Sequence, residues 1–216
     1  MSFDALAPHY RWLEFTLAGQ KLQRCRLAFL DRVTAAQNIL ILGEGNGRFL
    51  KELIGRVSNA QITCVDASAP MLSLARRRLE RFGLHSKNIQ FVHADALRWE
   101  PPPRLFDLLV THFFLDCFRP EQIDLLIGKL SRAAAAQASW LLADFQIPAC
   151  GWKRMRARAI HRLMYAFFRI ATRLPARTLT PPDHFLESHG FVLRQRRVTE
   201  LGLLHSDWWS RGGSNP

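Results

Sequence analysis

Asn38-Ile-Leu-Ile-Leu-Gly-Glu-Gly-Asn-Gly47 is the stretch that decides the fold. Its first five residues end in an apolar run, which is typical of a strand buried on both faces of a parallel sheet. The alternating glycines permit positive φ angles and let a ligand approach the backbone. Residues 47–56 follow with a helical pattern. The stretch therefore predicts a strand, a ligand-binding loop and a helix whose first N–H groups are free.

The rest of the chain repeats this alternation of strands and helices. Further apolar runs that predict strands lie at 62–65, 89–92, 106–110 and 139–145. Helical patterns lie at 10–30, 68–82, 120–136, 152–173 and between Pro181-Pro182 and Gly190. Residues 191–198 and the region around Leu203 predict a last antiparallel pair. This order predicts an α/β fold, a doubly wound sheet that is mostly parallel and has helices on both faces.

An acid follows the second predicted strand. Asp66 lies 23 residues after Gly43, and in nucleotide-binding folds an acid at this place binds ribose hydroxyls. A dinucleotide fingerprint would have its third glycine at position 48, where this chain has Arg48. The glycine spacing therefore argues against a dinucleotide.

Four motifs over residues 37–145 resemble those of class I S-adenosylmethionine (SAM)-dependent methyltransferases. They are the glycine loop, Val65-Asp66-Ala67-Ser68, Ala94-Asp95-Ala96, and Phe106-Asp107 at the start of the fourth predicted strand. The resemblance implies a Rossmann-like seven-stranded sheet with an antiparallel last strand. It also implies SAM as the cofactor and methyl transfer as the activity.

The resemblance assigns each part of SAM to residues of this chain. The glycines would line the methionine end, Asp66 would take the ribose hydroxyls, and Asp95 would accept the adenine amino group. Asp107 is expected to be structural. The residues expected to contact the cofactor are Gly43, Glu44, Gly45, Gly47, Asp66, Ala67, Asp95, Ala96, Thr111 and Tyr10.

One position departs from the family pattern. Ile41 stands where these enzymes usually have an acid, which commonly helps to hold the methionine amino group. Glu44 inside the loop is a candidate to replace that acid, and the alternative is a solvated loop carboxylate. The methionine end of the cofactor is where we expect this protein to differ from its relatives.

The segment after the fourth predicted strand is expected to face the acceptor, because ligands lie beyond the carboxyl ends of the strands. His112 is a candidate general base, and the alternative is a histidine that contacts SAM or packs under it. Phe113, Phe114 and Asp116 are candidate substrate residues, although Asp116 would also suit the cap of a turn. The Asn/Asp-Pro-Pro-aromatic motif of nucleic-acid amine methylation is absent from this segment.

The N-terminal segment resembles the aromatic segment that closes over SAM in many of these enzymes. Tyr10 would lie against the cofactor, and His9 would face the substrate as a second candidate base. The alternative is a packed helix start.

A basic segment holds most of the net charge of +12. Residues 152–177 carry eight Lys and Arg, and no acid lies between Asp144 and Asp183. Trp152, Met155 and Ala159 begin an apolar stripe at helical spacing. A lid helix over an apolar substrate, a helix on an anionic membrane, nucleic-acid binding and a plain solvated helix all fit the pattern. Nucleic acid is disfavoured because no base-stacking aromatic positions are evident.

The whole chain, 1–216, is expected to form one domain. Residues 1–36 would be a helical cap, 37–145 the SAM-binding core, and 150–178 a basic helical insertion or lid. The four cysteines form no C-x-x-C pair, so we expect no metal site and no disulfides. A cytoplasmic location, with peripheral contact to a membrane as an option, follows from that expectation.

The expected function is methyl transfer from SAM to a small, apolar or aromatic acceptor, as O- or C-methylation. A looser likeness of the C-terminal part to the ubiquinone/menaquinone C-methyltransferases fits such an acceptor. Two alternatives stay open at this stage: an RNA methyltransferase, and a non-catalytic SAM-binding or interaction protein of the same fold.

Overall fold

The computed structural model describes residues 19–57, 59–84, 87–172 and 179–212. Its strands are β1 (Asn38–Leu42), β2 (Gln61–Asp66), β3 (Ile89–His93), β4 (Phe106–His112), β5 (Ala134–Phe145), β6 (Phe191–Thr199) and β7 (Leu204–Arg211). Its helices are α2 (Gly19–Arg26), α3 (Arg48–Ile54), α4 (Ala69–Arg81), α5 (Pro120–Ala133), α6 (Gly151–Thr172) and α7 (Asp183–Ser188).

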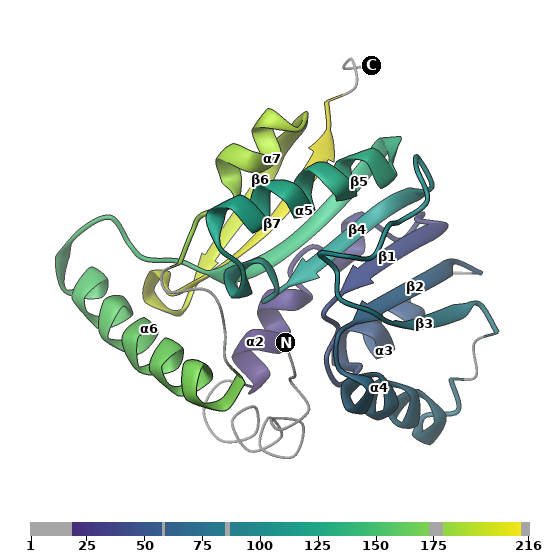
Figure 1. The fold of residues 1–216 in the computed structure, drawn as a ribbon, viewed down its shortest axis with the longest axis horizontal. Coiled ribbons are helices and arrows are strands. Elements are labelled where there is room, and N and C mark those ends of the chain that lie inside the picture. Colours follow the sequence, from purple (N-terminus) through teal and green to yellow (C-terminus); the bar gives the residue numbers. More distant parts are fainter. Residues whose placement is uncertain (1–18, 58, 85–86, 173–178, 213–216) are drawn as a thin grey trace.

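The strands form one seven-stranded sheet in the order β3-β2-β1-β4-β5-β7-β6 (Figure 1). The first five strands of the chain pair in parallel, and β7 is antiparallel to both β5 and β6. The predicted doubly wound sheet with an antiparallel last strand is confirmed. The order reverses between β1 and β4, which is where folds of this kind bind ligands.

Strand β1 is buried on both faces, as its apolar run predicts. Leu40 and Leu42 pack in a core that includes side chains of α5 and α7. Ile39 and Ile41 point the other way, into a core that includes side chains of α3 and α4. All four are at most 1% exposed. The alternation follows from the two-residue period of a strand, and it leaves β1 no polar face.

Some element boundaries differ from the predicted ones. The helix expected to reach residue 136 ends at Ala133, and β5 begins at Ala134 rather than at 139. Alanine favours helix, but Ala134 pairs with Phe106 of β4, and such tertiary pairing overrides propensity. The helix expected over 10–30 is described from Gly19, where α2 begins, and the chain continues past Arg26 into a 3-10 turn at Leu30–Arg32.

The glycine loop leaves β1 through residues with positive φ. Gly43, Gly45 and Gly47 have φ angles of 67°, 70° and 80°. A Cβ atom on Gly47 would lie 2.8 Å from the Cα of Ala75 on α4, whereas a Cβ on Gly45 would meet nothing within 4 Å. Gly47 therefore permits close packing of α3 on α4, and Gly45 borders open space.

Glu44 stabilises the start of α3. The N-cap residue, Gly47, has no side chain, and the Glu44 carboxylate accepts a hydrogen bond from the Leu50 N–H at 3.0 Å instead. Burial raises the pKa of Glu44 to about 7, although this hydrogen bond and the charge of Arg26 act to lower it. Glu44 is thus a helix cap, which neither interpretation of the sequence included.

We expect Gly47→Ala to destabilise the protein by about 2–5 kcal/mol, the sum of a left-handed φ penalty and a steric clash with Ala75. Gly45→Ala is the matched control, because it has the φ penalty of about 1–2 kcal/mol without the clash. Denaturant unfolding of both variants measures the difference. Equal losses would show that packing against α4 does not require Gly47.

The raised pKa of Glu44 predicts a pH-dependent stability. The unfolded chain releases this proton near 4.5 and the folded chain near 7, so the contribution is full below about pH 4.5 and is lost as the pH rises through 7. Between about pH 5 and 8, the unfolding free energy of the wild type should fall by about 1–2 kcal/mol more than that of Glu44→Gln. Glu80→Gln, an exposed change on α4, should show the same pH dependence of the unfolding free energy as the wild type. If wild type and Glu44→Gln show the same pH dependence, Glu44 does not have a raised pKa.

Candidate functional site

A cleft of about 110 Å³ lies at the carboxyl ends of β1, β2 and β4, where the strand order reverses. The glycine loop, the end of β2 and the loops after β3 and β4 form its walls. Eight residues expected to contact cofactor or substrate line it: Gly43, Gly45, Asp66, Ala67, Asp95, Ala96, Phe113 and Phe114. The fold therefore brings most of the predicted site together.

Asp66 is fixed at the cleft by the backbone around it. One carboxylate oxygen accepts a hydrogen bond from the Ser68 N–H at 2.9 Å, and the other accepts one from the Gly45 N–H at 3.4 Å. Ser68 in turn caps α4 by accepting a hydrogen bond from the Met71 N–H. The end of β2, the glycine loop and α4 thus hold this carboxylate in one orientation.

Asp95 lies in the loop after β3 and is also held by the backbone. Its Oδ1 accepts a hydrogen bond from the Leu97 N–H at 3.0 Å, and its carbonyl accepts from the N–H groups of Arg98 and Trp99. Within the described residues, its Oδ2 accepts no hydrogen bond. One carboxylate oxygen of Asp95 is therefore left to accept from a ligand.

Aromatic rings from the loop after β4 form the apolar wall of the cleft. A Cβ on Gly43 would lie 2.5 Å from Cδ2 of Phe114, so this ring requires a glycine beneath it. The rings of Phe114 and Phe118 meet with centroids 5.0 Å apart. Phe113 has a φ of 52°, which is rare for a residue with a bulky side chain. Strained backbone conformations of this kind cluster at functional sites. The wall is therefore tightly built and locally strained.

Two β4 residues with expected ligand contacts point into the core instead. Thr111 is fully buried and accepts a hydrogen bond from the Trp140 Nε1–H at 2.8 Å. His112 is buried edge-on against Phe49, with ring centroids 4.5 Å apart. Its Nδ1 has no hydrogen-bond partner in the part of the chain that the structure describes, and burial lowers its pKa well below the ordinary value. The geometry therefore corresponds to the packed alternative for His112 and does not suit a general base.

Asp116 is buried behind the cleft rather than lining it. Burial raises its pKa to about 6. Burial and the nearby Asp116 carboxyl raise the pKa of Asp144, at the end of β5, well above its usual range. Two carboxyl groups out of water favour protonated forms. Asp116 therefore belongs to a buried acidic pair in the described structure, and substrate contact by it stays a prediction.

The other predicted site residues fall outside the cleft lining or outside the described residues. Gly47 packs on α4 and Glu44 caps α3, as described above. Asp107 is structural, as expected, since its carboxylate accepts from the N–H groups of Gln37 and Asn38. His9 and Tyr10 lie outside the described residues, so their roles stay predictions.

Five lining residues were not predicted: Val65, Met71, Ala94, Cys117 and Phe118. Val65 and Ala94 belong to the quoted motifs and directly precede Asp66 and Asp95, and Cys117 and Phe118 follow Asp116. A wider window around the predicted residues would have included these four. Arg26 was missed for a different reason. It comes from α2, is buried, and places its guanidinium 5.3 Å from the centre of the Phe113 ring, a contact that no local pattern reveals.

Comparison with known proteins agrees with this architecture. A family model described as "Methyltransferase domain" matches residues 39–137. A demethylmenaquinone methyltransferase of Thermus thermophilus is 31% identical over 69% of this chain and 66% of its own length. A ubiquinone/menaquinone biosynthesis C-methyltransferase of Coxiella burnetii is 33% identical over 51% of this chain and 40% of its own length. The chain thus spans between two fifths and two thirds of these curated relatives.

Solved structures share the fold over nearly the whole chain. Magnesium protoporphyrin IX methyltransferase from Synechocystis, with bound SAH, has a TM-score of 0.70 at 14% identity and covers 97% of this chain and 96% of its own. The N-methyltransferase NodS from Bradyrhizobium japonicum, also with SAH, has a TM-score of 0.64 at 15% identity, covering 95% and 89%. At such identities the likeness shows the fold alone. Together with the glycine loop, the acids after β2 and β3, and the family match, it shows that the chain belongs to the class I SAM-dependent methyltransferases.

Proposed function

We propose that the protein transfers the methyl group of SAM to a small acceptor and that SAM lies in the cleft between the glycine loop and the Phe114 wall. The observation that carries the proposal is the pair of backbone-held carboxylates, Asp66 and Asp95, on the same cleft. Such fixed acceptors suit the ribose hydroxyls and the adenine amino group.

Groups around the cleft would suit each part of SAM. Asp66 would hold the ribose, Asp95 the adenine amino group, and the open space beside Gly45 would admit the methionine portion. Ile41 is buried in the core, so the ammonium would need another partner, and Glu44 is the one carboxylate of the glycine loop. When bound, SAM supplies an electrophilic methyl group; the chain would contribute alignment of the two reactants.

We further propose an acceptor with an apolar or aromatic portion, methylated on oxygen or carbon. The rings of Phe113, Phe114 and Phe118 would pack against such a portion. The names of the curated relatives, which refer to demethylmenaquinone and to C-methylation in ubiquinone and menaquinone biosynthesis, support this class.

Helix α6 offers a surface for peripheral contact with an anionic membrane. Trp152 and Met155 are 60% and 75% exposed, whereas Ala157 and His161 are buried on the opposite face. The first part of the predicted apolar stripe therefore faces solvent. Exposed basic residues such as Arg162 lie on the same helix, which stands at the side of the molecule (Figure 1). No helix in the described ranges is long and apolar enough to cross a bilayer.

We expect Asp66→Asn to weaken SAM binding by about 10- to 100-fold, because a charged acceptor for two hydroxyls is lost. Isothermal titration calorimetry with SAM measures the effect, and thermal unfolding without SAM checks that the variant folds. Asp31→Asn, an exposed carboxylate outside the cleft, should bind as the wild type does. Absence of any heat or thermal stabilisation with SAM in the wild type would refute the proposed function, since a bound ligand must stabilise the folded state.

For the membrane surface, we expect binding to vesicles that contain phosphatidylglycerol and little binding to pure phosphatidylcholine. Replacing Trp152 and Met155 together by Ala should weaken vesicle binding by about 10-fold or more, and added salt should weaken it further. Co-sedimentation measures both effects. Leu125→Ala, which removes an exposed apolar side chain on α5, is the control, and a similar loss in this variant would argue against a specific α6 surface.

A further inference from the structure

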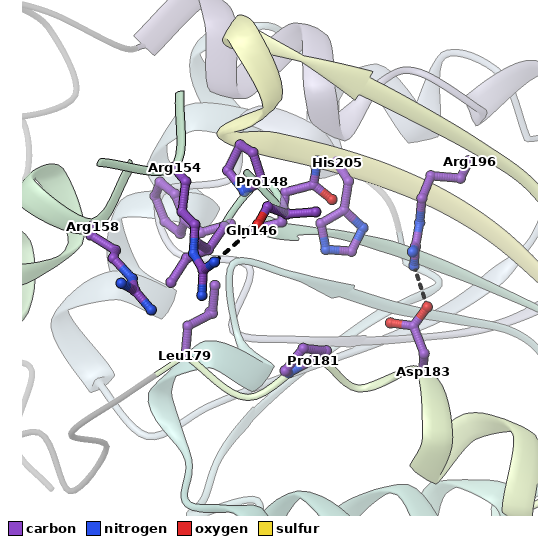
Figure 2. Close-up of a pocket in the computed structure, with 12 residues that line it drawn as sticks. Gln146, Pro148, Arg154, Arg158, Leu179, Pro181, Asp183, Arg196 and His205 are labelled. Carbon is purple, nitrogen blue, oxygen red and sulfur yellow. Dashed lines mark hydrogen bonds and ion pairs between the residues drawn. The ribbon is translucent and has the colours of Figure 1, made fainter. Parts of the chain in front are cut away.

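A second cavity, of about 470 Å³, lies at the carboxyl end of β5 (Figure 2). The end of β5, the start of β7, helix α6 and the segment from Leu179 to Asp183 surround it. Phe145 lines this cavity, and its ring lies 5.3 Å from the ring of Phe113, which lines the first cleft. The two spaces are therefore neighbours that share an aromatic wall.

One side of this cavity carries positive charge. Arg154 and Arg158 lie one helical turn apart on α6, and both line the cavity from the same side (Figure 2). Arg154 donates to the Ala149 carbonyl at 3.1 Å, whereas Arg158 makes no hydrogen bond or ion pair with any residue that the structure describes. Neither guanidinium has a carboxylate partner there. Two arginines in this arrangement suit an oxyanion.

The opposite side of the cavity carries an oriented histidine. His205 lines the cavity, and its Nδ1 lies 3.0 Å from Oδ2 of the fully buried Asp207. Arg196 donates to both oxygens of Asp207, at 2.7 and 2.6 Å, and also pairs with Asp183. Burial raises the pKa of Asp207, but the hydrogen bonds from Arg196 and His205 outweigh it and hold the pKa below the usual value. An ionised carboxylate at Nδ1 keeps the proton there and leaves Nε2 as the basic nitrogen.

We propose that this cavity binds the methyl acceptor, that Arg154 and Arg158 hold a carboxylate or phosphate group of that acceptor, and that Nε2 of His205 takes the proton from its hydroxyl. The inference rests on the proposed methyl transfer. As the acceptor oxygen bonds to the methyl carbon, its O–H proton passes to His205, and the S–CH₃ bond breaks with its electron pair on sulfur. Asp207 then stabilises the imidazolium. The reacting end of the acceptor lies against the wall of Phe113 and Phe145.

This assignment replaces His112 by a histidine that adjoins a cavity. It also specifies the acceptor. The molecule would carry an anionic group at one end and a hydroxyl at the other, separated by about the width of the cavity, and its apolar middle would contact Phe145. A cavity of this volume lies in the range of small-molecule sites. The two roles can be tested separately, because the arginines would bind one end of the acceptor and His205 would act at the other.

Binding of simple probes tests the arginine half. With S-adenosylhomocysteine present, we expect benzoate or phenyl phosphate to bind about 10-fold tighter than neutral benzamide, and the stronger of the two anions identifies the group. Arg158→Gln should abolish this preference, and Arg162→Gln, an exposed change on the same helix, should keep it. Equal binding of benzamide and both anions, or no binding of either anion at millimolar concentration, would overturn the proposal.

The histidine half has a spectroscopic readout. On addition of 3-hydroxybenzoate, the ring resonances of His205 should shift while those of His112 stay in place, and Asp207→Asn should change the tautomer seen in the ¹⁵N spectrum. His205→Gln should still bind benzoate, because the arginines remain. An unshifted His205, or a shift at His112 instead, would contradict the assignment. S-adenosylhomocysteine binding is measured in the same samples. If S-adenosylhomocysteine binds but His205 does not respond, only the assignment of His205 fails; if S-adenosylhomocysteine does not bind, the proposed function fails.

Discussion

Burial of β1 on both faces is the constraint on which the rest of the described structure depends. Its side chains alternate between two cores, one with α5 and α7 and one with α3 and α4. A strand enclosed in this way cannot carry a polar side chain toward a ligand without a large desolvation cost. With Ile41 in place of an acid, β1 offers no polar side chain at its carboxyl end, and the candidate ligand-binding groups come after the strand, where the glycine loop begins.

The same constraint explains how polar groups are distributed along that edge. Asp66 ends β2 and Asp95 follows β3, and backbone N–H groups hold both carboxylates, so they line the cleft without entering the core. Carboxyls a little deeper, at Asp116 and Asp144, lose their water and have raised pKa values. Asp207 is as deep but keeps its charge, because Arg196 and His205 surround it. For the buried acids Asp116, Asp144 and Asp207, the charged and hydrogen-bonding partners decide whether the pKa rises or falls.

Side chains of helix α6 face the protein core, a cavity and solvent. Ala157 and His161 are buried, Arg154 and Arg158 border a cavity, and Trp152 and Met155 are exposed. The apolar stripe suggested burial because spacings of three and four residues define a helix face. Spacing alone does not say whether protein, substrate or lipid covers that face.

The sequence by itself determined the fold class, most of the strands and helices, and eight of the residues that line the first cleft. These follow from local patterns: an apolar run enclosed by helices, glycines that permit positive φ, and acids directly after strands. Residue 134 shows the limit, since alanines that favour helix became the start of β5 through pairing with β4. The tertiary structure alone decided that Glu44 caps α3, that His112 packs in the core, and that His205 joins Arg154 at a second cavity. Arg154 and His205 are far apart in the chain, and the packing of β5, β7 and α6 brings both side chains to one cavity.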